Sequence, residues 1–197
     1  MYLALLTDAR LHALLRQLDE ELAATIREAG CPCCGGVLHW ARYPRKPRGL
    51  SPPCRPQECR RLSFCCATDA CRKRTTPPSV YFLGRKVYLS TVVVLVSAMR
   101  CGATPARMQR LSELVGASRR TLSRWQTWWR RTMPASAFWR SVSGSLMPPV
   151  VPWGLPLSLL ERFAGDLEHR LIALLRFVAP MSGSNTVPTG PVVVRAL

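Results

Sequence analysis

The stretch CPCCGG, residues 31–36, decides how this chain is organised. It places Cys31 and Cys34 in a CxxC pair that Gly35 and Gly36 follow directly. Two thiolates at this spacing can bind one metal ion, and glycines let the backbone turn tightly enough for its N–H groups to face the sulfurs. Cys33 lies inside the turn, so we expect it to point away from the metal. A closed structural zinc site takes four ligands, and a second pair must therefore follow.

The stretch FCCATDACRKR, residues 64–74, supplies that second pair, because Cys66 and Cys71 frame a four-residue turn. If residues 62–66 form a strand, Cys65 points to the opposite face from Cys66. The sequence therefore predicts one structural Zn²⁺ in a small ribbon, with no open position for a reacting water. The predicted ligands are Cys31, Cys34, Cys66 and Cys71.

The other cysteines leave alternatives open. Cys54 and Cys59 repeat the spacing of the second pair, but they lie in a Pro-rich loop that no predicted strand enters, so they rank second. His39 or Cys65 could also substitute as a ligand. A thioredoxin-like use of the CxxC pair is disfavoured, because Cys31 follows a predicted helix and not a strand. Since the N-terminus lacks the basic segment of a signal peptide, nine cysteines favour a metal or free thiols over disulfides.

The positive charge is concentrated in the middle of the chain. Of 28 basic residues 25 are Arg, and the net charge is +17. Residues 1–28 have a net charge of −2, residues 29–140 of +18 and residues 141–197 of +1. A genome that favours Arg over Lys would explain the choice of residue but not this concentration. A focused basic segment is typical of a nucleic-acid surface.

The segment TPARMQRLSELVGASRRTLSRWQTWWRR, residues 104–131, predicts a helix-turn-helix. Thr104 and Pro105 suit the start of the first helix, Gly116 suits the turn, and Ser118 suits the cap of the second helix. On a helical wheel, Leu122, Trp125 and Trp129 share one side and are expected to be core. The opposite side is basic and is predicted to contact DNA; it consists of Arg119, Arg120, Ser123, Arg124, Thr127, Arg130 and Arg131.

The early arginines of this helix are expected at base edges and the late ones at phosphates. Further phosphate contacts are predicted from the ribbon loop, at Arg45, Lys46 and Arg48. Basic residues on a helix are often only a solvated face. Here five arginines share one face with no acid among them, which favours contact with a ligand.

The predicted fold class is mainly α with a small zinc-ribbon β module, in which amphipathic helices at both ends flank the helix-turn-helix core. Leucines at three- and four-residue steps predict helices over residues 8–28 and about 157–178. The predicted domains are an N-terminal helix (1–30), a zinc ribbon (31–78), a helix-turn-helix domain (79–134), a connector with a C-terminal helix (135–180) and a disordered tail (181–197).

Three motifs in this order resemble a known unit. CPxCGG, then CRKRTTPPSVYFLGRKVYL, then LVGASRRTLSRW resemble the zinc-ribbon and helix-turn-helix unit of bacterial insertion-sequence transposases, over about residues 31–131. The resemblance implies that Cys31, Cys34, Cys66 and Cys71 bind zinc and that Arg119, Arg120 and Arg124 lie at DNA. Such transposases continue into an acidic-triad nuclease domain, whereas residues 132–197 contain three acids on one predicted helix. We therefore expect no DNA cleavage and no enzymatic activity from this chain.

The leading hypothesis is a cytoplasmic, nucleoid-associated protein that binds double-stranded DNA. One alternative is an RNA-binding zinc ribbon in which Trp40 and Tyr43 stack on unpaired bases. Another is an adaptor, or a homodimer, assembled through the helices at 8–28 and 157–178. No membrane partner is expected, because the apolar run at residues 91–99 is about half as long as a bilayer span.

Overall fold

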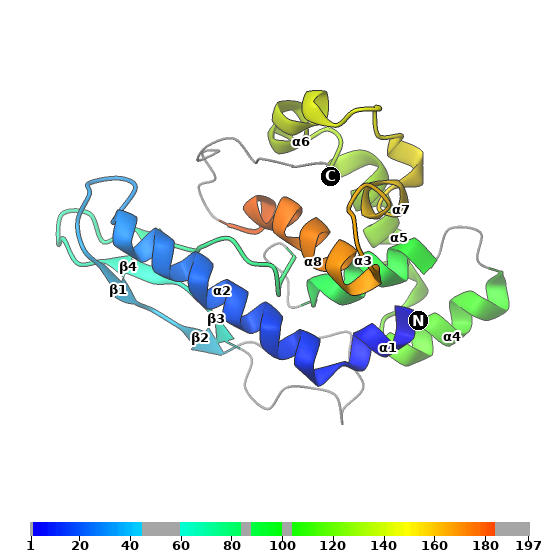
Figure 1. Ribbon diagram of the computed structural model, residues 1–197. Helices are drawn as coiled ribbons and strands as arrows, with labels where there is room; N and C mark the ends of the chain where they lie inside the picture. The colour runs from blue at the N-terminus through cyan, green and yellow to red at the C-terminus, as the bar shows by residue number, and fades with distance from the viewer. Residues whose placement is uncertain (1, 45–59, 84–87, 100–103, 184–197) are drawn as a thin grey trace.

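The computed structural model describes residues 2–44, 60–83, 88–99 and 104–183. The chain is mainly helical with a small antiparallel sheet, as the sequence predicted. In Figure 1 the strands lie at one end and most helices at the other, and α2 runs between them. The helices are α1 (Tyr2–Thr7), α2 (Ala9–Ala29), α3 (Ser90–Met99), α4 (Pro105–Val115), α5 (Arg119–Thr127), α6 (Ala137–Val142), α7 (Leu157–Leu160) and α8 (Leu167–Val178). Shorter turns are the π-helical η2 (Trp128–Thr132) and the 3-10 segments η3 (Ser143–Ser145), η4 (Pro152–Gly154) and η5 (Ala179–Ser182).

Helix α2 joins the two parts of the molecule. Asp8 caps it by accepting hydrogen bonds from the backbone N–H groups of Arg10 and Leu11 at 2.8 and 3.3 Å, and Gly30 ends it with a φ of 78°. The first half of its apolar stripe is buried in the helical core, and the second half lies in a smaller cluster with the strands. The predicted helix at 8–28 is therefore confirmed, and it packs within the chain itself.

The strands form two small antiparallel sheets, which are together called the ribbon below. In the three-stranded sheet, β4 (Phe64–Cys66) pairs antiparallel with β1 (Leu38–Trp40) on one side and with β5 (Arg74–Thr75) on the other. In a second, two-stranded sheet, β2 (Tyr43–Pro44) pairs with β3 (Arg60–Arg61). The register places Leu38 opposite Cys66. The strand that follows the first pair of cysteines therefore lies beside the strand that carries Cys66.

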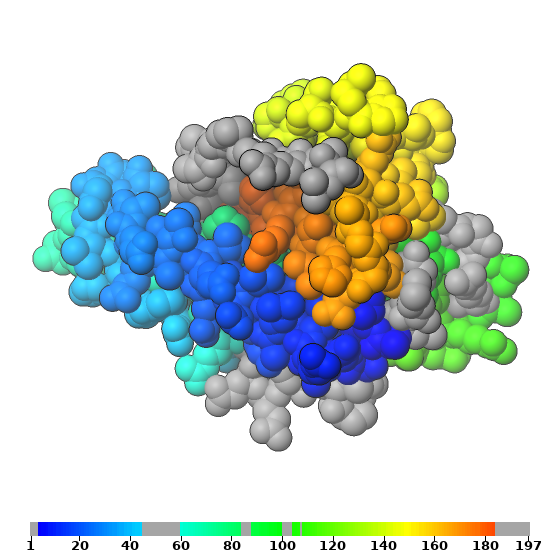
Figure 2. All heavy atoms as spheres, in the orientation of Figure 1, coloured from blue at the N-terminus to red at the C-terminus, as the bar shows by residue number. Residues whose placement is uncertain are grey.

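Helix α3 is the centre of the helical part. All ten of its residues are buried, which fits a helix that is apolar on every side. It contacts α1, α5 and α8, and these neighbours cover it in turn. In the space-filling view, α1, α2 and α8 lie together on one face of the molecule (Figure 2). Among the described residues, the structure contains no helix with both the length and the apolar character needed to cross a membrane.

A buried polar network fixes the segment that links the ribbon to α3. The Asp19 carboxylate accepts from the Ser79 hydroxyl at 2.5 Å and from the backbone N–H groups of Val80 and Tyr81 at 2.7 and 3.2 Å. The Ser182 hydroxyl accepts from the N–H of Ser79 at 2.7 Å. Burial outweighs these bonds and raises the pKa of Asp19 to about 6. The network therefore ties α2, the linking segment and the last described turn together.

The predicted C-terminal helix at 157–178 is wrong as one continuous helix. The structure has the short α7 and then α8, which begins at Leu167. Gly165 has a φ of 94°, and Asp166 caps α8 by accepting from the N–H of His169 at 3.0 Å. A positive φ and a new N-cap end one helix and start another, although the apolar spacing continues across the break.

The connector between η2 and α7 contains a further helix, α6. Ser136 caps α6 by accepting from the backbone N–H of Trp139 at 3.1 Å. Most leucines of α8 and α2 are buried inside the chain, although Leu14 of α2 exposes 37% of its surface. A homodimer or adaptor contact through either helix would have to use the exposed faces, and it stays a prediction.

Candidate metal centre and basic helix

Four cysteine sulfurs meet at the end of the ribbon. The Sγ atoms of Cys31, Cys34, Cys66 and Cys71 all lie within 4.8 Å of one another. Cys31 Sγ is 3.7 Å from Cys71 Sγ, and Cys34 Sγ is 3.5 Å from Cys66 Sγ. Within the described part of the chain, this is the only group of three or more residues whose side chains could share a metal ion. It consists of the four predicted ligands.

The first pair is held by a tight turn after α2. The N–H of Gly35 donates to the carbonyl of Cys31 at 2.8 Å, and the N–H of Cys31 donates to the carbonyl of Gly36 at 2.9 Å. Gly35 has a φ of 70°, which favours glycine. The backbone N–H groups of Cys33 and Cys34 face the Cys31 sulfur and lower the pKa of its thiol to about 7. A lowered thiol pKa favours the thiolate, which is the form that binds metal.

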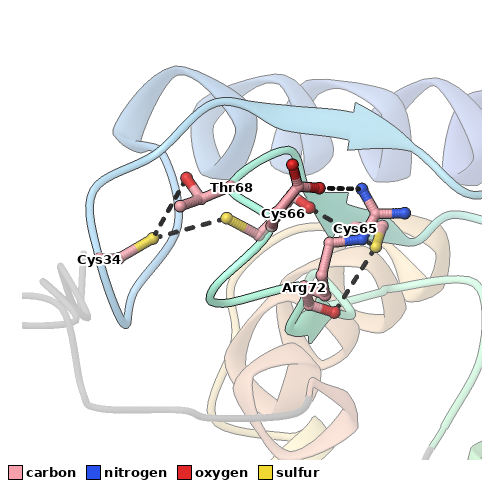
Figure 3. A network of polar contacts seen from close by, with 6 residues as sticks. Cys34, Cys65, Cys66, Thr68 and Arg72 are labelled. Carbon is pink, nitrogen blue, oxygen red and sulfur yellow. Dashed lines mark hydrogen bonds and ion pairs between the residues drawn. The ribbon is translucent and has the colours of Figure 1, made fainter.

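The second pair is held by the turn between β4 and β5. Thr68 closes this turn by accepting at its carbonyl from the N–H groups of Cys71 and Arg72, both at 2.9 Å. The Thr68 hydroxyl also lies 3.8 Å from Cys34 Sγ, so the two turns touch. Figure 3 shows Cys34 on the first turn, facing Cys66 at the end of β4 and Thr68 on the second turn. The sequence contained no signal for the part played by Thr68, because its contact with the first turn is tertiary.

Glycine is required where the two turns meet. A Cβ atom on Gly36 would clash with Thr68 Oγ1, and it would lie 3.3 Å from Cys34 Sγ and 3.4 Å from Cys66 Sγ. A side chain at this position would therefore push into the ligand cluster. The pattern CxxCGG is explained by this close approach and by the positive φ of the preceding Gly35.

The neighbouring cysteines stay outside the cluster. Cys33 is exposed, and its interaction with Lys73 raises the pKa of the Lys73 ammonium. Cys65 Sγ contacts the carbonyls of Arg72 at 3.6 Å and of Cys66 at 3.7 Å and does not join the four clustered sulfurs (Figure 3). His39 is exposed and pairs with Cys65 across the sheet. The rival pair, Cys54 and Cys59, lies outside the described residues.

The donor set fits a closed tetrahedral metal site. Four sulfurs at about 2.3 Å from a zinc ion would lie about 3.8 Å apart, close to the two separations of 3.5 and 3.7 Å. The four residues come from both ends of the ribbon, so one ion could hold α2, β4 and β5 in place. Four thiolates would leave no position for a substrate or a water.

The helix that follows Gly116 has the predicted two-sided character. Gly116 has a φ of 59°, and Ser118 caps α5 by accepting from the N–H of Thr121 at 3.3 Å. Three apolar residues of α5 and η2 are buried, with exposed fractions of 1% for Leu122, 8% for Trp125 and 0% for Trp129. The predicted DNA-contacting residues are all exposed: Arg119, Arg120, Ser123, Arg124, Thr127, Arg130 and Arg131.

Helix α5 is anchored on both of its sides. The rings of Trp125 and Tyr88 meet edge to face at 5.1 Å, and α5 contacts α3. Arg119 also donates to the side-chain oxygen of Gln109 on α4 at 2.8 Å. The basic side of α5 therefore has a fixed orientation. Arg45, Lys46 and Arg48 of the ribbon loop lie outside the described residues.

Comparisons with protein-family models, with curated proteins and with solved structures found no match. The resemblance to transposases therefore stays a prediction that the motifs of this chain carry.

Proposed function

We propose that this chain is a zinc-stabilised, transposase-like DNA-binding protein that contacts duplex DNA through the basic side of α5 and η2. The observation that carries the proposal is the separation of this segment into two sides. Leu122, Trp125 and Trp129 are buried and Trp128 is half-buried, whereas the five arginines of the segment are exposed and have no acidic neighbour on it. A rigid, basic helix side at the surface suits the negatively charged grooves of DNA.

The cysteine cluster supports the proposal by giving the ribbon a metal-dependent fold. We assign it one structural Zn²⁺, because zinc commonly takes four thiolates in tetrahedral geometry. Zinc with four thiolates carries a charge of −2, which nearby cations such as Arg72, Lys73 and Arg74 offset. We assign the ion no catalytic role, and we propose no enzymatic activity. A cytoplasmic location on the nucleoid is part of the same proposal.

Duplex DNA is favoured over RNA because the aromatic residues of the ribbon already have partners. The ring of Trp40 lies 4.7 Å from that of Phe64, and the Arg42 guanidinium lies 4.1 Å from the Trp40 ring. Arg74 lies 5.6 Å from the ring of Tyr43. Stacking on unpaired bases, as the RNA alternative requires, would have to displace these contacts. The exposed arginines of α5 and η2 can still contact phosphates.

Two measurements on the purified chain test the proposal. Metal analysis should find one zinc ion per chain. Selection from a random pool of duplex DNA should enrich a defined motif, and the selected duplex should outcompete structured RNA. Recovery of metal-free, folded protein would remove the zinc assignment. An unenriched pool, or better competition by RNA, would contradict the DNA assignment.

A further inference from the structure

Trp153 is an exposed aromatic residue that lies outside the predicted helix-turn-helix. It exposes 76% of its surface, whereas Trp125, Trp129 and Trp139 are buried. Two apolar neighbours in the same connector are also exposed, Met147 at 75% and Val151 at 39%. Burying a large aromatic ring is strongly favourable in water. The exposed ring therefore offers a surface on which a flat ligand can stack.

The backbone holds Trp153 in a defined place. It is the central residue of η4, where the N–H of Gly154 donates to the carbonyl of Val151 at 3.1 Å and the N–H of Leu155 donates to that of Pro152 at 3.3 Å. The Ser158 hydroxyl also donates to the carbonyl of Val151, at 3.2 Å. An aromatic ring on a constrained turn loses little conformational entropy when it binds.

The turn lies beside the basic helix. η4 contacts η2, which carries Arg130 and Arg131, and both arginines are exposed. Between Glu113 and Glu161 the sequence has six arginines and no acid. Trp153 therefore lies on a turn that contacts the segment carrying two exposed arginines. A nucleic acid offers the complement of both the ring and the arginines, because its bases are flat and apolar on their faces and its phosphates are negative.

We propose that Trp153 stacks on an unpaired base of the DNA whose phosphates contact Arg130 and Arg131. This inference rests on the proposed function and extends it. The preferred substrate would be a duplex next to a single-stranded or distorted segment, not a fully paired duplex. The base gains a stacking surface, and the neighbouring arginines neutralise its phosphate.

The test compares two probes of one sequence, a blunt duplex and the same duplex with a short single-stranded tail that contains 2-aminopurine. Fluorescence anisotropy measures affinity, and quenching of 2-aminopurine reports stacking on an indole ring. The unaltered chain should bind the tailed probe roughly fivefold to a hundredfold more tightly and quench it. Trp153→Ala should lose the preference and the quenching while it keeps its affinity for the blunt duplex. Trp153→Phe should keep part of the preference.

Val37→Ala is the matched control, because Val37 is a 65% exposed apolar residue on the ribbon; it should behave like the unaltered chain. An unchanged tail preference in Trp153→Ala, while the blunt duplex still binds, would overturn this inference alone. An equal loss for both probes would also overturn it, as would a change in self-association by light scattering with unchanged DNA binding. Failure of the unaltered chain to bind either probe would overturn the proposed function and this inference with it.

Discussion

Cys65 and Cys66 are adjacent on β4, yet only Cys66 belongs to the sulfur cluster. Cys66 Sγ lies 3.5 Å from Cys34 Sγ, whereas Cys65 Sγ contacts the carbonyl of Arg72 at 3.6 Å. Successive side chains of a strand point to opposite faces. The pleat of β4 therefore directs Cys66 into the sulfur cluster and leaves the Cys65 thiol outside it.

This separation makes Cys66→Ser and Cys65→Ser a matched pair. We expect Cys66→Ser to lose most of its bound zinc and to melt at a lower temperature, because a structural zinc site contributes its binding energy to folding. Cys65→Ser should keep a full equivalent of zinc and a nearly unchanged melting temperature. Metal analysis and thermal unfolding of both variants check this. Equal zinc loss in the two variants would contradict the ligand assignment.

Gly36→Ala should weaken metal binding, because its new methyl group would meet Thr68 Oγ1 and the sulfurs of Cys34 and Cys66. Overpacking of this kind costs roughly 1–3 kcal/mol. Competition with a zinc chelator measures the change in affinity. The added substitution Thr68→Ala removes the nearest clash and should restore part of the loss.

Gly144→Ala is the control for this experiment, since nothing lies within 4 Å of a Cβ atom at that position. Its zinc affinity should equal that of the unaltered chain. A Gly36→Ala variant that competes for zinc as well as this control would show that the two turns have more room than the structure gives them.

Arg124→Ala should reduce DNA affinity and its dependence on salt. Each lost phosphate contact lowers the slope of log affinity against log salt by about 1. Arg176 is an exposed residue of α8, so Arg176→Ala removes the same charge at a different place and should change the slope little. Anisotropy titrations at several salt concentrations compare the two. The same slope change in both variants would indicate that net charge, and not the basic side of α5, governs binding.

Asp19 should make stability depend on pH. Its pKa is raised from 3.8 to about 6 in the folded chain, because burial disfavours the charged form. The folded chain therefore keeps this proton to higher pH than the unfolded chain does. The contribution of Asp19 to stability is complete below about pH 4 and is lost as pH rises through about 6, a change of about 3 kcal/mol.

Asp19→Asn isolates this effect from the protonation of the cysteine ligands, which is common to both proteins. The free energy of unfolding by urea, measured between pH 4 and pH 8, should fall with rising pH by about 3 kcal/mol more in the unaltered chain than in Asp19→Asn. Parallel pH profiles would show that Asp19 stays charged in the folded state and that its hydrogen bonds outweigh its burial.

Local signals in the sequence located most elements. Asp8 and Gly30 mark the ends of α2, and Pro105, Gly116 and Ser118 mark the helices around the predicted turn. These residues act on the backbone next to them, so helix ends can be predicted from them without knowledge of distant contacts. The break before α8 was missed, because the apolar spacing runs across Gly165 and Asp166 and outweighed their local signal.

The sequence by itself determined the four clustered cysteines and the two sides of α5, because ligand spacing, strand alternation and helical periodicity are local properties. Only the tertiary structure decided that Thr68 contacts the backbone at Gly36 and that Asp19 is buried, with hydrogen bonds from Ser79 and Val80. It also decided that Trp153 is exposed on a turn that contacts η2. Each of these depends on which distant segments pack together. Burial and close approach are set by that packing, and spacing along the chain does not encode it.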